Sequence, residues 1–481
     1  MPPALSYGET VREGCLCPFL SGGECPAAKH PRGLLLIYTR AVDIVPELPK
    51  SAATPSPGGH SPSDEGADDY DSEARPGGKR KRGSAGGQNS HKRGGLKHKG
   101  NSVEEAEARS LQNRHNKRAE VHQSKTFSAD IHAERTRPGW NGKAPDQDTQ
   151  ALAVKSWLDG TLEDKMVDFK LIPYTLRGSA HPTYLLDHEG RKFLVRTSQC
   201  EWLKDNADGF WEEIKTFLEN ILQFEESNEK REKDPRGPHV PCILGYYRPY
   251  SKSPVLAKYH TKFEKEAEAL MNSPIFARLV TWASKLVEVH FPHVAKRYKV
   301  CGEWHRTHSK QGPPFGLFWN FCVNGMLLGQ YRIHCQPHAD SKNIVGVCLI
   351  IVYQIPASIQ APTFDHTKRS WLCIWEAGVC IELPPWVAVM YPSSLFYHFN
   401  VDIKDAKIIT TNGPMPTPKD IAECQGRGSL VFFNQAAMFQ SSETGYATLK
   451  AAEKAGKSRV RNFGEDINAA LQMHAVYAPL T

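Results

Sequence analysis

The second half of the chain is a succession of short β-like segments, and this feature limits the possible folds more than any other. Runs rich in β-branched and aromatic residues alternate there with turn residues. The expected strands are residues 315–323, 326–334, 344–354, 370–376, 379–383, 386–391, 395–401 and 429–434. Asn324-Gly325 joins the first two, and this dipeptide is the strongest short signal for a hairpin. Many short strands with turns between them predict a β-sandwich or jelly roll.

The region before these strands has a mixed character. Residues 166–174 and 183–197 read as strands, with a turn at 188–190 in the second segment. Apolar residues recur at helical spacing in residues 210–222 and 275–289, which indicates two amphipathic helices packed on a core. We therefore expect an α+β protein. Its predicted parts are a mostly disordered arm (1–150), a mixed flanking region (151–310), a β core (311–445) and a C-terminal helical segment (446–481).

The front of the chain has the composition of a disordered arm. Residues 46 to about 150 are dominated by Pro, Gly, Ser and charge and show no apolar periodicity. Residues 77–100 contain Lys and Arg but no Asp or Glu, and they include the tight run Lys79-Arg80-Lys81-Arg82. Such a run predicts import into the nucleus or a tether to nucleic acid, and the alternative is a solvated linker.

Cysteine usage and hydropathy exclude several other classes of protein. No CxxC pair occurs among the twelve cysteines, so neither a zinc ribbon nor a thioredoxin motif is expected. Cys15, Cys17 and Cys25, with His30, fit no common spacing of metal ligands. No signal peptide is visible, and the front has no apolar stretch near the roughly 20 residues that a membrane helix needs. We therefore expect an intracellular protein with reduced thiols and no membrane partner.

A candidate metal site begins at Pro337-His338-Ala339-Asp340, between two expected strands. Alternate residues of an extended segment share a face, so His338 and Asp340 can reach one ion from the same side. This is the chain's one His-x-Asp sequence, and His398 follows several strands later, where a third ligand is needed. Two histidines and one carboxylate form the facial triad of non-haem iron(II) oxygenases, which leaves other positions on the iron open. The alternative is that His398 is an ordinary core histidine.

The last expected strand supplies a cation for a dicarboxylate cosubstrate. Arg427 opens the run Arg427–Gln435, and Ser429 lies two residues later on the same face. A guanidinium can hold a carboxylate through two parallel hydrogen bonds, and the Ser429 hydroxyl could assist it. Lys404 and Lys407 are the alternative cations.

These motifs together resemble the TET/JBP family of Fe(II), 2-oxoglutarate-dependent dioxygenases, which oxidise 5-methylpyrimidines in nucleic acid. The run Pro337–Asn343 is similar to the family's iron motif, and Arg427–Gln435 is similar to its final strand. Residues 315–450 look most like the fungal, transposon-associated branch. The resemblance covers the last 170 residues well, the preceding 150 loosely and the arm not at all.

The resemblance implies a fold, cofactors and site residues. The fold would be a double-stranded β-helix (jelly roll) with helices packed outside. His338, Asp340 and His398 would bind Fe(II), while Arg427 and Ser429 would bind 2-oxoglutarate. The residues at the family's base-contacting positions are Asn343, Phe433 and Gln435.

Two departures from the family bear on the substrate. Gln435 stands where animal members have a histidine, and the chain lacks their cysteine-rich zinc module. In addition, the distance from His398 to Arg427 is longer than is usual in the family, so the loop from Asp402 to Gly426 would have to be an excursion.

The activity that the resemblance implies is oxidation of 5-methylcytosine in DNA to 5-hydroxymethylcytosine and beyond, and the basic run Lys79–Arg82 predicts that the protein is nuclear. The alternatives are the same chemistry on RNA or protein, a cupin-like binding protein without turnover, and a non-catalytic, transposon-associated protein that binds nucleic acid. The sequence leaves open the methylated base, its sequence context and the oligomeric state.

Overall fold

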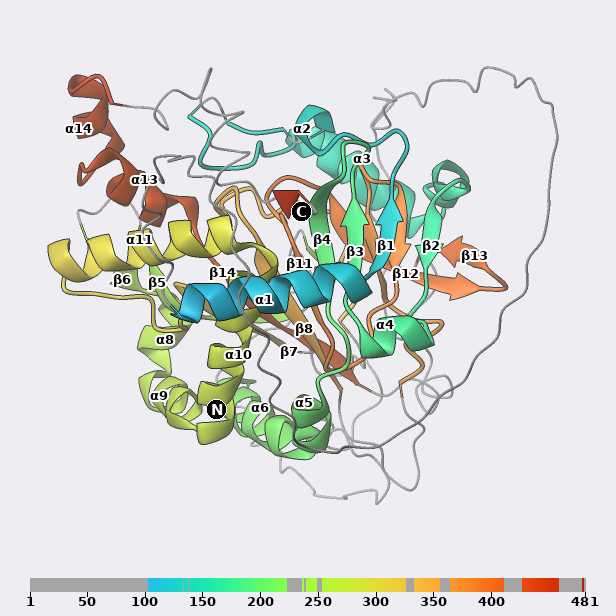
Figure 1. Ribbon diagram of the computed structural model, residues 1–481, viewed down its shortest axis with the longest axis horizontal. Helices are drawn as coiled ribbons and strands as arrows, with labels where there is room; N and C mark the ends of the chain where they lie inside the picture. The colour runs from blue at the N-terminus through green and yellow to red at the C-terminus, as the bar shows by residue number, and fades with distance from the viewer. Residues whose placement is uncertain are drawn as a thin grey trace, which may run out of the picture.

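Two β-sheets and a set of covering helices make up the structure, a computed structural model (Figure 1). It describes residues 103–132, 134–136, 138–222, 236–237, 239–248, 253–325, 333–354, 364–410, 426–457 and 478–479. The predicted α+β class is confirmed for these residues. No helix in these ranges has the length and apolar character needed to cross a membrane.

The larger sheet has ten strands in the described part of the chain. Strands that lie side by side in this sheet are often distant in sequence. The order is β1-β3-β4-β11-β8-β14-β7-β5-β6, and β15 also pairs with β4. These strands are β1 (Glu120–Gln123), β3 (Thr183–Leu186), β4 (Arg191–Arg196), β5 (Val240–Tyr247), β6 (Val255–Leu256), β7 (Asn320–Gly325), β8 (Cys348–Gln354), β11 (Ala388–Tyr391), β14 (Arg427–Phe433) and β15 (Ala478–Pro479). Because β14 lies between β7 and β8, its side chains are held from both sides.

The smaller sheet has five strands in the order β13-β12-β9-β10-β2. They are β2 (Lys170–Ile172), β9 (Trp371–Ile374), β10 (Val379–Ile381), β12 (His398–Lys404) and β13 (Lys407–Ile409). Asp405 and Ala406, both with positive φ, make the two-residue turn between β12 and β13. Part of the predicted excursion after Asp402 is therefore a hairpin.

Helices cover the sheets. They are α1 (Val103–Arg118), α2 (Ala129–His132), α3 (Gln147–Leu158), α4 (Leu176–Ala180), α5 (Glu201–Asp205), α6 (Ala207–Leu222), α8 (Lys258–Lys262), α9 (Glu264–Asn272), α10 (Pro274–His290), α11 (Pro292–His308), α13 (Ala436–Thr444) and α14 (Leu449–Lys454). In Figure 1, α1 and α11 cross in front of the large sheet, and α6, α8, α9 and α10 gather below them. Against the smaller sheet, α3 and the 3-10 helix Glu163–Met166 pack buried side chains such as Trp157 and Met166.

A single buried arginine links the two sheets. Arg196, at the end of β4, donates to the carbonyl oxygens of Ile172 (3.2 Å), Pro173 (3.0 Å) and Glu382 (2.9 Å), which belong to the smaller sheet or its connections. It also donates to Thr183 Oγ1 at 3.0 Å. Burial lowers the pKa of Arg196 to about 10, so the side chain stays charged at neutral pH. Charge-assisted hydrogen bonds of this kind fix the sheets relative to each other.

Most of the predicted elements are confirmed. The segment 183–197 is the β3–β4 hairpin, and the two predicted helices are α6 and α10. The segment 166–174 contains a strand of only three residues, β2. From residue 344 onward, six predicted strands overlap the observed β8, β9, β10, β11, β12 and β14.

The predicted hairpin at Asn324-Gly325 is wrong. Both residues belong to β7, where Asn324 pairs with Pro241 and Ser429, and Gly325 pairs with Val240. A strand with a neighbour on each side satisfies its backbone by ladder pairing, and this tertiary pairing outweighs the local turn preference. No strand follows at Ile333 and His334, and the rest of the second predicted strand lies outside the described residues.

Disorder up to about residue 150 is also wrong for the part that the structure describes. Residues 103–118 form α1, and Trp140 is fully buried, donating its indole N–H to Glu443 Oε2 at 2.8 Å. The helix α1 consists mainly of strong helix formers with few apolar residues, so it shows no amphipathic period. Sheet pairing also crosses the predicted boundary at residue 311, because β5 pairs with β7.

Several predictions fall on residues that the structure does not describe. The basic run Lys79–Arg82, the rest of residues 77–100 and the cysteines Cys15, Cys17 and Cys25 lie outside the described residues. Nuclear import therefore stays a prediction.

A buried lysine makes the stability of the fold depend on pH. Lys192 on β4 is 1% exposed, and its Nζ lies 4.4 Å from the ring centre of Tyr184 and 5.4 Å from that of Phe291. Burial lowers the pKa of Lys192 from 10.5 to about 7. The unfolded chain therefore binds one more proton than the folded chain between these two values, and stability rises with pH across that window.

We expect Lys192→Met to remove this pH dependence. The free energy of unfolding of the wild type should rise relative to that of the variant by roughly 1.4 kcal/mol per pH unit between pH 7.5 and 9.5. The variant should be the more stable protein at pH 7, because it buries no ammonium group. Urea unfolding at several pH values measures both effects, with the exposed Lys204→Met as control. Parallel stability curves for the wild type and Lys192→Met would contradict the assignment.

Candidate metal centre

The predicted site residues line one cavity between the two sheets. Its volume is about 410 Å³, and its walls come from β7, β8 and β14 of the large sheet and from β9 and β12 of the small sheet. The lining includes all eight predicted site residues: His338, Asp340, Asn343, His398, Arg427, Ser429, Phe433 and Gln435. The fold thus brings together residues that are up to 97 positions apart in the sequence.

Three of these residues form a cluster that can hold a metal ion. One nitrogen of His338, one nitrogen of His398 and one carboxylate oxygen of Asp340 lie within 4.8 Å of one another. His398 Nε2 is 4.0 Å from Asp340 Oδ2, and the two imidazole ring centres are 4.3 Å apart. Small side-chain rotations would bring the three donors to the roughly 2.0–2.2 Å bond lengths that such ions require.

Backbone pairing holds the cluster in place. His398 begins β12, and its N–H donates to the His338 carbonyl at 2.9 Å. Two residues further along β12, Asn400 N–H donates to the carbonyl of Cys335, which lies three residues before His338, and Cys335 N–H donates to Asn400 Oδ1, both at 2.9 Å. Residues 335–338 therefore run antiparallel to β12. This pairing places the two histidines opposite each other.

Each histidine is oriented by a hydrogen bond from its other ring nitrogen. His338 Nδ1 lies 2.6 Å from the carbonyl oxygen of Gln336, and His398 Nδ1 lies 3.0 Å from that of Phe396. A carbonyl oxygen can only accept a hydrogen bond, so Nδ1 of each ring carries the hydrogen and Nε2 keeps its lone pair free. Burial lowers the pKa of both imidazoles, and for His338 the shift is large. Neutral imidazole is the form that binds metal.

The carboxylate is ionised. Burial alone would raise the pKa of Asp340, but the nearby Arg236 guanidinium, together with a side-chain hydrogen bond from Ser393, holds the pKa below its usual value. Arg236 Nη1 is 3.4 Å from Asp340 Oδ1, while Asp340 N–H donates to Ser393 O at 2.9 Å. The site therefore offers two neutral nitrogens and one anionic oxygen, a donor set that suits iron(II).

Arg427 and Ser429 lie across the cavity on β14. Arg427 is 4% exposed and donates from Nη1 to Ile333 O at 3.0 Å, while Ser429 Oγ accepts from Asn324 Nδ2 at 2.9 Å. Gly428 between them is required, because a Cβ there would lie 2.1 Å from Cζ of Tyr353 on the neighbouring strand. The Tyr353 ring therefore packs directly over the strand backbone at this point.

The three predicted base-contacting residues lie together at another part of the cavity. Asn343 and Gln435 pair as an isolated β-bridge, and Phe433 ends β14 two residues before Gln435. Asn343 Nδ2 donates to Ser393 Oγ at 3.3 Å, so the same loop that holds Asp340 also positions this amide. Phe433 is 8% exposed.

Sequence reasoning missed several residues of the site. Arg236 lies in a short polar segment with no periodic signal, and Asn324 was assigned to a turn. Asn400 lies two residues after His398, on the same face of β12, and its period-two spacing was the one signal that could have found it.

No family model matches the chain, and no curated protein matches it. Among solved structures, that of NgTET1 in complex with 5mC DNA matches with a TM-score of 0.34 at 12% identity. The match covers 65% of this chain and 99% of that one.

Proposed function

We propose that the protein is a non-haem Fe(II), 2-oxoglutarate-dependent dioxygenase. The observation that carries this proposal is the convergence of His338, Asp340 and His398 in the cavity that Arg427 and Ser429 line from the opposite sheet. A protein that only binds a ligand has no need of both an open metal face and a buried cation beside it.

The residues assigned to the cofactors fit them chemically. His338 and His398 would bind iron through Nε2, and Asp340 would bind it through a carboxylate oxygen. Arg427 would hold the remote carboxylate of 2-oxoglutarate, with Ser429 as a second donor. Iron and 2-oxoglutarate, when bound, would supply the oxidising chemistry. The chain would contribute orientation, charge neutralisation and exclusion of water from a cavity enclosed by two sheets.

We assign the fold to the double-stranded β-helix class and the chain to the TET/JBP-like dioxygenases, in the fungal, transposon-associated branch. Two sheets that enclose the metal cluster support the fold assignment. The motifs Pro337–Asn343 and Arg427–Gln435 support the family assignment, and both contribute residues to one cavity.

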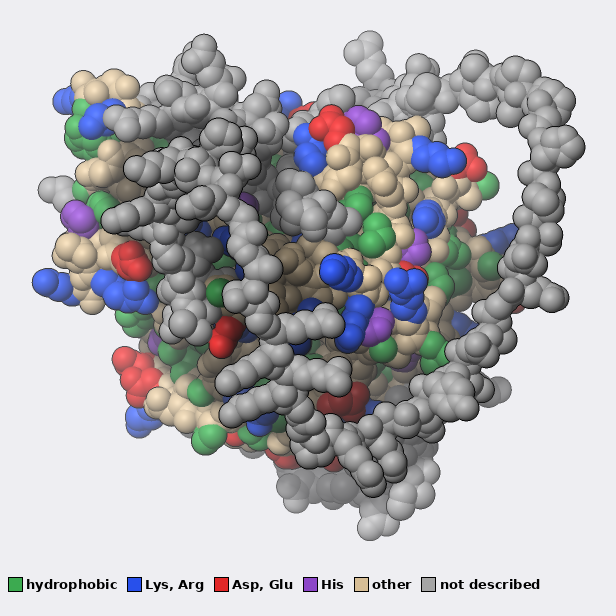
Figure 2. Space-filling model, in the orientation of Figure 1, with side chains coloured by type: hydrophobic (Ala, Val, Ile, Leu, Met, Phe, Trp, Pro, Cys, Tyr) green, Lys and Arg blue, Asp and Glu red, His purple; other side chains and the backbone are tan. Residues whose placement is uncertain are grey.

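The proposed substrate is 5-methylcytosine in DNA, oxidised to 5-hydroxymethylcytosine and beyond. Such a base must leave the stack to reach a cavity of this kind. Asn343 and Gln435 can read the polar edge of the base, and Phe433 can stack on it. Figure 2 shows Lys and Arg side chains around the C-terminal end of α1, whose last turn carries Lys117 and Arg118. We propose a nuclear location from the basic run in residues 77–100.

Nucleoside mass spectrometry tests this function directly. The full chain would be incubated with methylated DNA, Fe(II), 2-oxoglutarate and ascorbate, and succinate would be measured alongside oxidised cytosine. Succinate with oxidised cytosine supports the whole proposal. Succinate without it supports a dioxygenase that acts on RNA or protein, and no succinate in any condition contradicts an enzyme.

Replacement of Asn343 separates base reading from a structural role. We expect Asn343→Ala to keep substrate-free decarboxylation of 2-oxoglutarate but to lower oxidised cytosine by about tenfold or more, since a base edge would lose its partner. Asn272→Ala, an exposed amide on α9, serves as the control. If Asn343 only holds Ser393, both reactions should fall together. Unchanged product would rule out base reading.

A further inference from the structure

A second cavity opens beside the edge strands β1 and β2. It has a volume of about 430 Å³ and shares no lining residue with the cavity of the metal cluster. Its walls come from β1 and the segment after it, from the segment around β2, and from the turn between β9 and β10. This volume lies within the roughly 300–1,000 Å³ typical of sites for small ligands.

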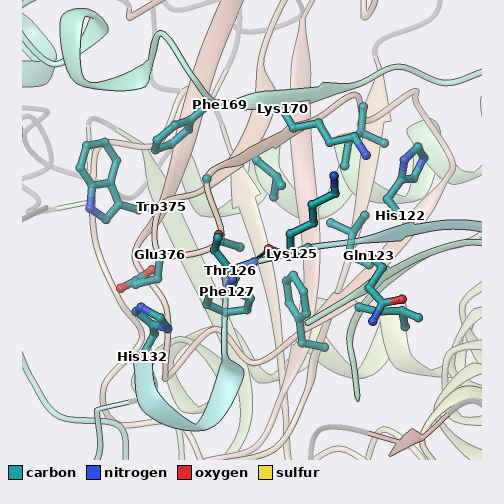
Figure 3. Close-up of a pocket in the computed structure, with 18 of the residues that line it drawn as sticks. His122, Gln123, Lys125, Thr126, Phe127, His132, Phe169, Lys170, Trp375 and Glu376 are labelled. Carbon is teal, nitrogen blue, oxygen red and sulfur yellow. Dashed lines mark hydrogen bonds between the residues drawn. The ribbon is translucent and has the colours of Figure 1, made fainter. Parts of the chain in front are cut away.

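The interior of this cavity is aromatic. Phe127 and Phe193 are 3% and 1% exposed, and their rings meet edge to face at 5.0 Å. Opposite them, the rings of Phe169 and Trp375 lie 5.2 Å apart. Figure 3 shows Trp375 and Phe169 at one end of the cavity, with Phe127 below. The Phe169 ring is partly exposed, so it offers a face on which a flat, unsaturated ring can stack, while the buried rings of Phe127 and Phe193 make the interior apolar.

The rim of the cavity carries an excess of positive charge. Lys125, Lys165 and Lys170 line it and are exposed, and Figure 3 shows Lys125 and Lys170 at the end away from Trp375. The acidic side chains in the lining are Asp168 and Glu376. Burial raises the pKa of Glu376 to about 8, so this carboxyl is mostly protonated at neutral pH and repels an anion little. The three lysines therefore outweigh one ionised acid.

Backbone hydrogen bonds hold both walls of the cavity. Phe127 O accepts from His188 N–H at 2.8 Å, which ties the segment after β1 to the β3–β4 turn. Gly378 has a φ of 59° in the turn between β9 and β10, and its carbonyl accepts from Lys170 N–H at 2.8 Å. The walls are thus formed before any ligand binds, which reduces the entropy that binding would cost.

We propose that this cavity binds a nucleotide, with the base against the aromatic side chains and the phosphate at the lysines of the rim. The cavity is aromatic at the end near Trp375 and positively charged at the end near Lys125. A ligand in which a flat ring is joined to an anionic group matches this arrangement. A free mononucleotide and one nucleotide of a single strand share this chemistry. The site is independent of the iron centre, and the proposal does not rest on the proposed reaction.

Calorimetry with the full chain and AMP tests the proposal. We expect Lys125→Ala/Lys170→Ala to weaken AMP binding by about tenfold or more, through loss of charge-assisted hydrogen bonds. Phe169→Ala should weaken it by about tenfold through loss of stacking. The control Lys204→Ala/Lys258→Ala removes two exposed lysines outside the cavity and should leave the affinity unchanged. His398→Ala should also leave it unchanged, which places the binding outside the metal centre.

Two further ligands, a single-stranded oligonucleotide and inorganic phosphate, show which form of nucleotide the cavity binds. A labelled single-stranded oligonucleotide, followed by fluorescence anisotropy, should lose affinity in the same two variants if the site takes a nucleotide within a strand. Loss for AMP alone assigns the site to a free mononucleotide. Equal affinities of inorganic phosphate and AMP, together with no effect of Phe169→Ala, would overturn the nucleotide assignment. So would unchanged binding of both AMP and the oligonucleotide in both cavity variants.

Discussion

Replacement of His398 by alanine should abolish turnover while leaving the fold intact. The side chain supplies one of the three donor atoms that lie within 4.8 Å of one another, and no fourth His, Cys, Asp or Glu joins this group among the described residues. Loss of an outer-shell partner typically costs 10–100-fold in metal affinity or activity, so loss of a ligand should lower both by about 100-fold or more. Succinate formation and anaerobic Fe(II) binding measure the two effects.

The control for this experiment must remove a histidine without touching the cavity. His308→Ala serves, because His308 is exposed near the end of α11. Circular dichroism should show the same fold for both variants. Fe(II) binding by His398→Ala with wild-type affinity would mean that the cluster is not the metal site, and the proposed chemistry would fall with it.

Replacement of Arg427 by lysine should weaken 2-oxoglutarate binding by about tenfold or more, although the charge is kept. A lysine is a point charge and lacks the planar fork that grips a carboxylate through two parallel hydrogen bonds. The buried position allows no easy substitute, since Arg427 is 4% exposed and is fixed by Ile333 O. The apparent KM for 2-oxoglutarate, measured at saturating Fe(II), should rise accordingly, while Fe(II) affinity should stay unchanged.

Replacement of the two alternative cations, Lys404 and Lys407, tests the competing assignment of the 2-oxoglutarate site. Lys404 and Lys407 face solvent around the β12–β13 turn, and neither lines the cavity. Lys404→Ala/Lys407→Ala should therefore leave the KM for 2-oxoglutarate unchanged, as should Arg306→Lys on the surface of α11. An unchanged KM in Arg427→Lys, with a raised KM in the double lysine variant, would move the cosubstrate site to that hairpin.

Local sequence patterns were sufficient to predict an element or a site residue where its neighbours in sequence are also its neighbours in space. The β3–β4 hairpin follows from two strand-like runs on either side of the turn at 188–190, and the helices α6 and α10 follow from the helical spacing of their apolar residues, which the sequence displays directly. His338 and Asp340 were found for the same reason, since two alternate residues of an extended segment share a face. The approximate position of β14, which carries Arg427 and Ser429, was also readable from its apolar run.

Other features depended on contacts that no local pattern contains. Asn324-Gly325 has the sequence of a turn but lies inside β7, because β5 and β14 satisfy its backbone from both sides. The helix α1 was missed for a different reason, because it consists mainly of good helix formers without an apolar stripe and a search for apolar periodicity does not find it.

The sequence by itself determined which residues could ligate a metal, and it placed His398 on a strand. Only the tertiary structure decided that these residues meet. The pairing of residues 335–338 with β12 sets His338 opposite His398, and the facing sheet brings Arg427 and Ser429 into the same cavity. The tertiary structure also placed Arg236 beside Asp340, and it formed the second cavity from segments more than 200 residues apart. The physical reason is that burial and hydrogen-bond satisfaction are properties of the packed chain, and a one-dimensional pattern constrains them only along each segment.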